Sequence, residues 1–174
     1  MRSCQAKYVS CASALESVAI LPAALHAVQS GRSGLRTSDV VVDVPESIPR
    51  VEADAGLLER AIANLVANAL EASPPHRPVR ITAGSVLDRV ELRVIDQGPG
   101  IPVDQRDRVF SPFQRLGDRP NGNGVGLGLA VARGFVEAMD GELTIEDTPG
   151  GGATMVVSLP VPVRVTQDVD GANS

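Results

Sequence analysis

Aromatic residues are nearly missing from this chain of 174 residues, which has no Trp, one Tyr and three Phe. A hydrophobic content of 43% still supplies a core, so wholesale disorder is excluded and the core has to be aliphatic. The same shortage argues against binding of single-stranded nucleic acid, because that binding stacks bases on aromatic rings.

Lysine is also scarce, since Lys7 is the only lysine among 16 basic residues, and the net charge is −5. A surface that binds nucleic acid is normally basic, so we expect no nucleic-acid partner. An acidic protein that binds a polyphosphate needs local help from a divalent cation and from backbone N–H groups aimed at the phosphates.

Cysteines and long apolar runs are few as well. Cys4 and Cys11 have no His or Cys cluster nearby and fit no zinc spacing, so we expect reduced thiols in a cytoplasmic domain. The apolar run at 18–25 contains Pro22 and is far shorter than the roughly 18 residues of a membrane span. Polar residues follow Arg2, unlike a secretion signal, and we expect no direct membrane contact.

Periodicity and turn residues predict a chain that mixes helices and strands. The expected elements are helices at 12–29, at 55–73 and from the glycine run at 122–128 to about 139, one or two helical turns at 104–109, and strands at 40–44, 79–83, 90–95, 143–146 and 153–159. The second and third strands should form a hairpin. Gly31 and Gly34 would close the first helix, and Gly141 would be the left-handed residue that ends the last one.

The helix at 55–73 is the best defined, with Asp54 as a favourable N-cap. One face carries an apolar stripe, and another carries Asn64, Asn68 and Glu71. Asn is locally unfavourable inside a helix, so the pair calls for an explanation. It is either a solvated polar face or a metal site, since an amide oxygen is a hard ligand suited to Mg²⁺.

Three further motifs follow along the chain. Asp96-Gln-Gly-Pro-Gly100 comes directly after a predicted strand, and is either a tight turn or an acceptor for an exocyclic amine. Phe110-Ser-Pro-Phe113 holds two of the three Phe and is either loop packing or part of a site. The glycine run leads into a helix N-terminus, and is either a hinge or a phosphate cradle.

The order and spacing of these four motifs resemble the ATP-binding domain of sensor histidine kinases, in a wider group with gyrase, Hsp90 and MutL. The N, G1, F and G2 boxes of that family read here Asn64-Leu-Val-Ala-Asn68, Asp96-Gln-Gly-Pro-Gly100, Phe110-Ser-Pro-Phe113 and Gly124-Val-Gly-Leu-Gly-Leu129. The ending at 150–160 also looks like the family's terminal hairpin, so the resemblance covers about 40–160.

The resemblance implies a fold and a division of the chain. The fold would be an α/β (α+β) two-layer sandwich of the Bergerat type, with a mixed, mostly antiparallel sheet and helices on one face. Residues 1–38 would be an N-terminal helical segment or linker, 39–160 the ATP-binding domain and 161–174 a disordered tail.

The resemblance further implies ATP and Mg²⁺ as cofactors. Asn68 would coordinate Mg²⁺, Asp96 would accept from the adenine amine, and Arg115 would contact phosphate. Residues 111–123 would be an ATP lid, disordered without nucleotide from about residue 116. The full set of expected ATP-binding residues is Asn64, Asn68, Asp96, Gly98, Gly100, Ile101, Phe110, Phe113, Arg115, Gly124, Val125, Gly126, Leu127, Gly128, Leu129 and Thr154.

The chain departs from the family pattern in two ways. Glu71 and Ala72 stand where the family often has Lys and an aromatic or His, and we assign Glu71 no role. Asn64 stands where ATPases of the wider group have a catalytic Glu, which favours phosphoryl transfer over hydrolysis. Neither His26 nor His76 has the sequence context of a phospho-acceptor, so we expect the isolated chain not to autophosphorylate.

The expected partners are therefore the dimerisation and phospho-acceptor domain of a parent kinase and, through it, a response regulator. The motifs at 112–117, 137–142 and 147–152 look most like potassium-sensing KdpD kinases of actinobacteria, which implies a membrane-anchored parent. Two alternatives stay open: an anti-sigma-factor-like serine kinase and a degenerate nucleotide-binding interaction module.

Overall fold

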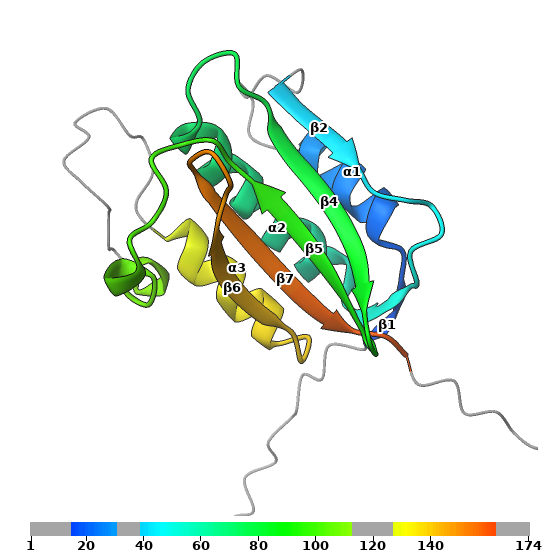
Figure 1. Ribbon diagram of the computed structural model, residues 1–174. Coiled ribbons are helices and arrows are strands. Elements are labelled where there is room, and N and C mark those ends of the chain that lie inside the picture. The colour runs from blue at the N-terminus through cyan, green and yellow to red at the C-terminus, as the bar shows by residue number, and fades with distance from the viewer. Residues whose placement is uncertain (1–14, 31–38, 113–126, 163–174) are drawn as a thin grey trace, which may run out of the picture.

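A five-stranded sheet forms one layer of the molecule (Figure 1). The computed structural model describes residues 15–30, 39–112 and 127–162. The strands run in the spatial order β2 (Val40–Asp43), β4 (Val79–Val86), β5 (Arg89–Ile95), β7 (Ala153–Pro160) and β6 (Glu142–Asp147). The β2–β4 pair is parallel and the other three pairs are antiparallel, so the sheet is mixed and mostly antiparallel, as predicted.

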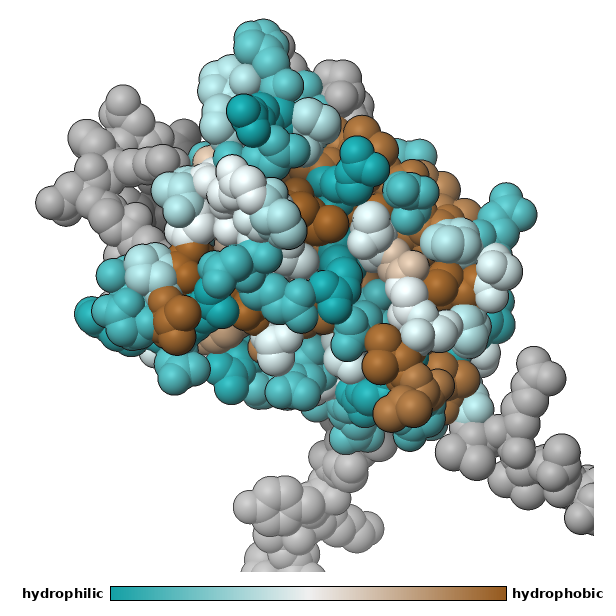
Figure 2. Space-filling view, in the orientation of Figure 1, coloured by the Kyte–Doolittle hydropathy of each residue, from teal (hydrophilic) through white to brown (hydrophobic). Residues whose placement is uncertain are grey.

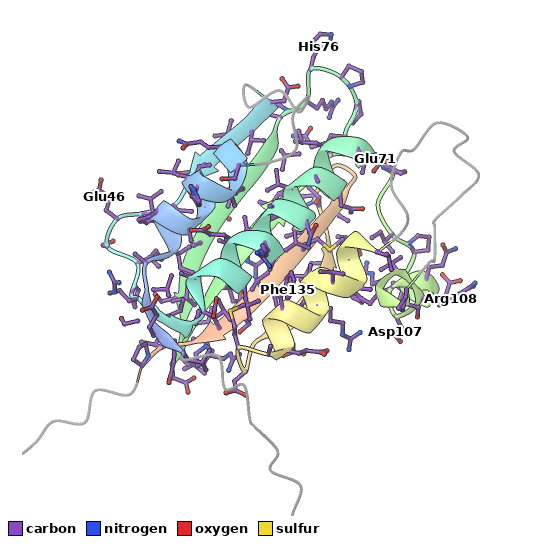
Figure 3. The ribbon with its side chains drawn as sticks, turned by 180° about the vertical axis from the view of Figure 1, so that it is seen from behind. Glu46, Glu71, His76, Asp107, Arg108 and Phe135 are labelled. Atoms are coloured by element: carbon purple, nitrogen blue, oxygen red, sulfur yellow. The ribbon has the colours of Figure 1, made fainter. Side chains whose placement is uncertain are left out.

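Three helices form the second layer: α1 (Ile20–Ser30), α2 (Ala55–Ala72) and α3 (Gly128–Glu137). They cover one face of the sheet, as the two opposite views show (Figures 1 and 3). The predicted two-layer sandwich is thus confirmed. None of the helices in the described ranges is long and apolar enough to cross a membrane.

The core between the layers is aliphatic. In β5, Val90, Leu92 and Val94 are fully buried while the alternate residues are not, which is the period of a strand with one covered face. The predicted stripe of α2 meets them, and its members Leu58, Ile62, Leu65 and Ala69 are buried. All the largest fully buried side chains of the described residues are Ile, Leu, Met and Val.

The opposite face of the sheet is open and dominated by polar side chains (Figure 2). There the Arg93 guanidinium forms ion pairs of 2.7 Å with Glu91 and with Glu146. These hydrogen bonds, to Glu91 first and then to Glu146, raise the pKa of Arg93 above its ordinary value. Most side chains of the open face are therefore polar, whereas the buried residues of β5 point at the helices.

Helix α2 starts where the sequence predicts. Asp54 Oδ1 accepts a hydrogen bond of 2.9 Å from Leu57 N, and its carbonyl accepts from Leu58 N at 2.9 Å. Ser73 is the C-cap, and its N–H donates to Ala69 O at 2.9 Å. Pro74 and Pro75 follow, neither of which has an N–H to continue the helix.

The N-terminal prediction is wrong in its start. Residues 16–18 are not helical but form β1 (Glu16–Val18), which pairs antiparallel with β3 (Val51–Ala53), and neither strand was predicted. Strands of three residues carry no readable period. Arg50 fixes the pair, donating from Nη2 to Ser17 O at 2.6 Å. Gly31 and Gly34 lie outside the described residues.

Two boundaries further along also differ from prediction. Strands β4 and β5 extend to a two-residue turn at Leu87 and Asp88, so β4 is three residues longer than expected. At the end of α3 the left-handed residue is Asp140, with φ 54°, rather than Gly141. Gly141 is the residue after the left-handed position of this C-cap motif, and its N–H donates to Val136 O at 3.0 Å.

Packing explains why position 141 is a glycine. A Cβ there would lie 2.8 Å from side-chain atoms of both Leu159 and Val136. The strand after α3 would then be pushed away from β7.

Helix α1 belongs to the same core as the rest. Ile20, Ala23, Ala24 and Ala27 are buried, and His26 Nδ1 lies 2.6 Å from Glu59 Oε2 of α2. The short alanines let the two helices approach closely. Residues 16–30 therefore pack with the domain expected at 39–160, while 163–174 lie outside the described residues.

Candidate functional site

A buried carboxylate at the end of β5 is the centre of the candidate site. Asp96 is 3% exposed, and its Oδ1 accepts hydrogen bonds from Gly98 N at 2.8 Å and Ala153 N at 3.0 Å. Its own N–H donates to Ala153 O at 2.9 Å. Both side-chain hydrogen bonds reach Oδ1, so Oδ2 is the oxygen that can accept from a ligand.

Glycines let two loops close around this carboxylate. A Cβ on Gly98 would lie 2.6 Å from the Ala72 carbonyl oxygen at the end of α2. A Cβ on Gly152, which has a φ of 116°, would overlap the Asp96 carbonyl oxygen. Gly100 also has a positive φ, of 77°, and its Cβ would lie 3.1 Å from Gly152 O. A Cβ at any of these three positions would thus crowd the main chain beside Asp96.

Helix α2 brings its asparagines towards the same place. The Ala72 side chain faces Gly98, because a Cβ on Gly98 would lie 3.1 Å from the Ala72 Cβ. Asn68 is one turn before Ala72 and Asn64 one turn earlier, and residues four apart share a helix face. Both asparagines are half-buried. Glu71 is exposed near this end of α2 (Figure 3).

The F-box phenylalanine is held against α3. Two short 3₁₀ helices, η2 (Val103–Gln105) and η3 (Arg108–Phe110), fill the predicted helical turns. Phe110 packs against the core, and the Arg133 guanidinium lies 5.0 Å from its ring centroid. Arg133 is in turn paired with Glu137 at 2.8 Å. Phe113 lies outside the described residues.

The start of α3 is the described part of the G2 box. The helix begins at Gly128 with Leu127 as N-cap, and the Leu127 side chain makes no capping hydrogen bond. Its first N–H groups are thus available to an anion. Leu129 packs partly buried against the core. Of the remaining predicted contacts, Arg115, Gly124, Val125 and Gly126 lie outside the described residues.

Two other predicted residues lie beside Asp96 in the sheet or its loop. Thr154 is 5% exposed, pairs with Ile95 across β5 and β7, and shares a hydrogen bond of 2.9 Å with the Thr148 hydroxyl. Ile101 ends the G1 loop and packs against the core.

Sequence reasoning missed Arg106, which ties the G1 loop to the edge strand β6. Its Nε donates to Ile101 O at 3.3 Å, its Nη1 to Ile145 O at 3.1 Å and its Nη2 to Asp147 Oδ1 at 2.6 Å. Ile145 and Asp147 lie 39 and 41 residues further along the chain, and Ile101 lies in the adjoining loop. No local motif therefore marks Arg106.

The donor set around the site fits a hard cation that takes few protein ligands. Within the described ranges, no three or more His, Cys, Asp or Glu residues gather to hold a metal ion. The half-buried Asn68 offers an amide oxygen, which suits Mg²⁺ because that ion takes few protein ligands and completes its shell with water and phosphate.

Comparisons with known proteins agree with this geometry. Residues 53–163 match the family model described as histidine kinase-, DNA gyrase B-, and HSP90-like ATPase. The chain is 51% identical over 142 residues to the sensor protein KdpD of Rathayibacter rathayi, covering 82% of this chain and 16% of that protein. It is 50% identical over 142 residues to the sensor protein KdpD of Mycobacterium tuberculosis H37Rv, with 80% and 16% covered. The chain thus spans about a sixth of these relatives' length.

Solved structures resemble it along most of its length. The mycobacterial sensor histidine kinase MprB superposes with a TM-score of 0.70 at 28% identity, covering 86% of this chain and 99% of that one. The ATP-binding domain of PrrB from Mycobacterium tuberculosis superposes with a TM-score of 0.66 at 26% identity, again covering 86% and 99%.

Proposed function

Because the chain belongs to the family of histidine kinase-, DNA gyrase B- and HSP90-like ATPases, we propose that it is the Mg-ATP-binding catalytic domain of a KdpD-type sensor kinase. It delivers the γ-phosphate of ATP to a His on a dimerisation domain elsewhere in the parent protein. The observation that carries this proposal is the buried Asp96 carboxylate, fixed through one oxygen and open to a ligand through the other.

Adenine recognition follows from that arrangement. The exocyclic amine of adenine donates to Asp96 Oδ2, while Oδ1 keeps its backbone partners. Gly98 and Gly100 let the loop beside the base pack closely on Ala72 and on Gly152, and Ile101 and Thr154 are the other residues that we expect near the base. A carboxylate acceptor favours adenine over guanine, since guanine presents a carbonyl oxygen where adenine has the amine.

Phosphate binding combines a metal with backbone donors. Asn68 would hold Mg²⁺ through its amide oxygen, Asn64 would lie near the phosphates, and the ion would supply positive charge to offset that of the triphosphate. The N–H groups at 124–129 donate to the phosphates at the positive end of α3. Arg115 contributes a charge-assisted contact.

Phosphoryl transfer then depends on positioning rather than on a base within this chain. Catalysis of this reaction rests mainly on alignment and charge neutralisation. The wider group's catalytic Glu is replaced by Asn64, which does not activate water. Neither His26, which is paired with Glu59, nor His76 has the sequence context of a phospho-acceptor. We therefore place the acceptor on the partner domain, which in turn phosphorylates a response regulator.

A transfer assay tests this function. Labelled Mg-ATP is incubated with the chain and with a separately expressed dimerisation and phospho-acceptor domain of a KdpD-type kinase, each alone and together. We expect acid-labile, base-stable label on the second protein only in the mixture. Acid-stable label on a serine, or label on this chain alone, would contradict the proposal.

A separate variant tests the assignment of Asn68 as the metal ligand. Asn68→Ala should abolish the Mg²⁺ dependence of ATP affinity, measured by calorimetry with and without the ion. Ala is a better helix former than Asn by roughly 0.5 kcal/mol, so the variant should unfold no earlier than the native chain. A lost affinity therefore cannot be blamed on unfolding, and an unchanged Mg²⁺ dependence would remove Asn68 from the site.

A further inference from the structure

A pair of hydrogen bonds joins the end of α2 to the residue that follows Asp96. Gln97 N donates to Ser73 Oγ at 3.3 Å, and Gln97 Oε1 accepts from Arg77 Nη1 at 2.9 Å. We propose, on the basis of the proposed ATP site, that Ser73 and Arg77 are positioning residues for adenine. They set how strongly the site prefers adenine to other bases. We call Ser73, Arg77 and Gln97 the loop clamp.

The chemistry of the clamp fixes one orientation of Gln97. A guanidinium has only donors, so the amide must turn its oxygen towards Arg77. The Ser73 hydroxyl holds the backbone of the same residue. Gln97 is thus held at both main chain and side chain, and Asp96 is the residue directly before it.

The turn at 74–77 explains how Arg77 reaches Gln97. Arg77 N donates to Pro74 O at 3.2 Å, which closes a four-residue turn. Pro75 supplies the fixed φ of the second position, and His76 takes the left-handed third position with a φ of 70°. The His76 side chain projects outward at the tip of this loop (Figure 3), while Arg77 follows it back towards the G1 loop.

The clamp also sets a spacing within the site. The G1 loop meets the end of α2 at Ser73 and where Gly98 lies against Ala72, and it meets the turn after the helix at Arg77. The same helix carries Asn68, one turn before Ala72. Helix α2 therefore positions both Asp96, the adenine acceptor, and Asn68, the metal ligand. Loss of the loop-clamp hydrogen bonds would let Asp96 move relative to Asn68.

The hydrogen bond between Arg77 and Gln97 is exposed. Water competes with such a bond, so it adds little to folding stability. Its removal should act on the geometry of the loop and leave the unfolding transition in place, which separates a positioning role from a structural one.

The test measures the affinities of ATP and of inosine triphosphate, in which a carbonyl oxygen replaces the adenine amine. Arg77→Ala and Gln97→Ala should each weaken ATP by about three- to tenfold, the range of one modest hydrogen bond, and leave inosine triphosphate unchanged. The double variant should lose no more than either single one. Arg77→Lys, which keeps a donor, should restore part of the discrimination.

Arg80→Ala is the matched control, because Arg80 is an exposed arginine on the neighbouring strand whose ion pair with Asp43 is 3.8 Å long. It removes the same charge and should change neither affinity. An equal loss for both nucleotides in Arg77→Ala, or none, would overturn the inference. Asp96→Asn is run beside them: if it lowers ATP affinity while the clamp variants do not, only this inference fails, and if it has no effect the proposed site itself fails.

Discussion

At the scale of single residues, the candidate site depends on where side chains are missing as much as on where they are present. Asp96 keeps its carboxylate buried because two backbone N–H groups replace water at Oδ1. Those N–H groups come close only because Gly98 and Gly152 have no Cβ to collide with Ala72 and with the Asp96 backbone. The glycines thus supply the geometry that the carboxylate needs.

Gly98→Ala should destabilise the fold by about 1–3 kcal/mol, since the backbone must move away from the Ala72 carbonyl oxygen. Urea denaturation followed by circular dichroism measures the change. Gly84→Ala is the matched control: a Cβ there meets nothing within 4 Å, so a gain of roughly 0.5–1 kcal/mol is expected in the strand. Equal stability of the two variants would show that the close approach at Gly98 is not obligatory.

His76→Gly tests the turn that carries Arg77. Glycine adopts the left-handed conformation of position 76 without steric cost, so the φ of 70° should be retained. We expect ATP affinity to stay within about twofold and stability to change by less than about 1 kcal/mol, because relief in the fold is offset by entropy in the unfolded chain. A large loss of affinity would mean that the His76 side chain itself takes part in the site.

At the scale of elements, α2 serves the core with one face and the candidate site with another. Its buried stripe meets the sheet, its asparagines lie on a second face, and its last residues hold the G1 loop. This division was readable from the sequence because 18 residues span several turns and both patterns repeat. The strands β1 and β3 were not readable, since each has three residues and their pairing is long-range.

Contacts between distant segments set the limit of prediction in the site as well. The motifs located Asp96 and its glycines, but nothing local pointed to Arg106 or Arg77, whose partners lie 41 and 20 residues away. The end of α3 was misassigned for a related reason: a glycine usually marks the left-handed C-cap, yet Gly141 is required by contacts with Leu159 and Val136, and Asp140 takes the left-handed position.

Asp54→Ala tests the start of α2. Removing the acceptor for Leu57 N should cost about 1 kcal/mol of unfolding free energy, measured by guanidinium titration. Because Asp54 is at the opposite end of the helix from Ala72, ATP affinity should not change. A variant as stable as the native chain would show that water replaces the cap fully.

At the scale of the whole molecule, the site occupies one end of a sheet whose helices all cover the same face (Figure 3). Helix α1 completes the helical layer. It lies outside residues 53–163, which match the family model, yet it shares the core through Ile20, Ala23, Ala24 and Ala27. Its role in the fold was not apparent from the sequence, because nearly every residue from Ile20 to Val28 is apolar and no single face stands out.

A chain that begins at residue 39 should therefore be less stable than the full chain by at least about 3 kcal/mol, since it exposes the surface of α2 that α1 buries and loses β1 as well. Guanidinium denaturation gives both the midpoint and the slope. An identical transition in the two chains would place α1 outside the cooperative unit.

The role of Asp96 as the adenine acceptor is tested most directly by a calorimetric titration of Mg-ATP into the native chain and into Asp96→Asn. The amide oxygen can replace Oδ1 for Gly98 and Ala153, but its NH₂ then faces the adenine amine, donor against donor. We predict a loss of affinity of about tenfold or more with little change in the unfolding temperature. Equal affinity in a folded variant would contradict the assignment of Asp96 as the adenine acceptor, and with it the site.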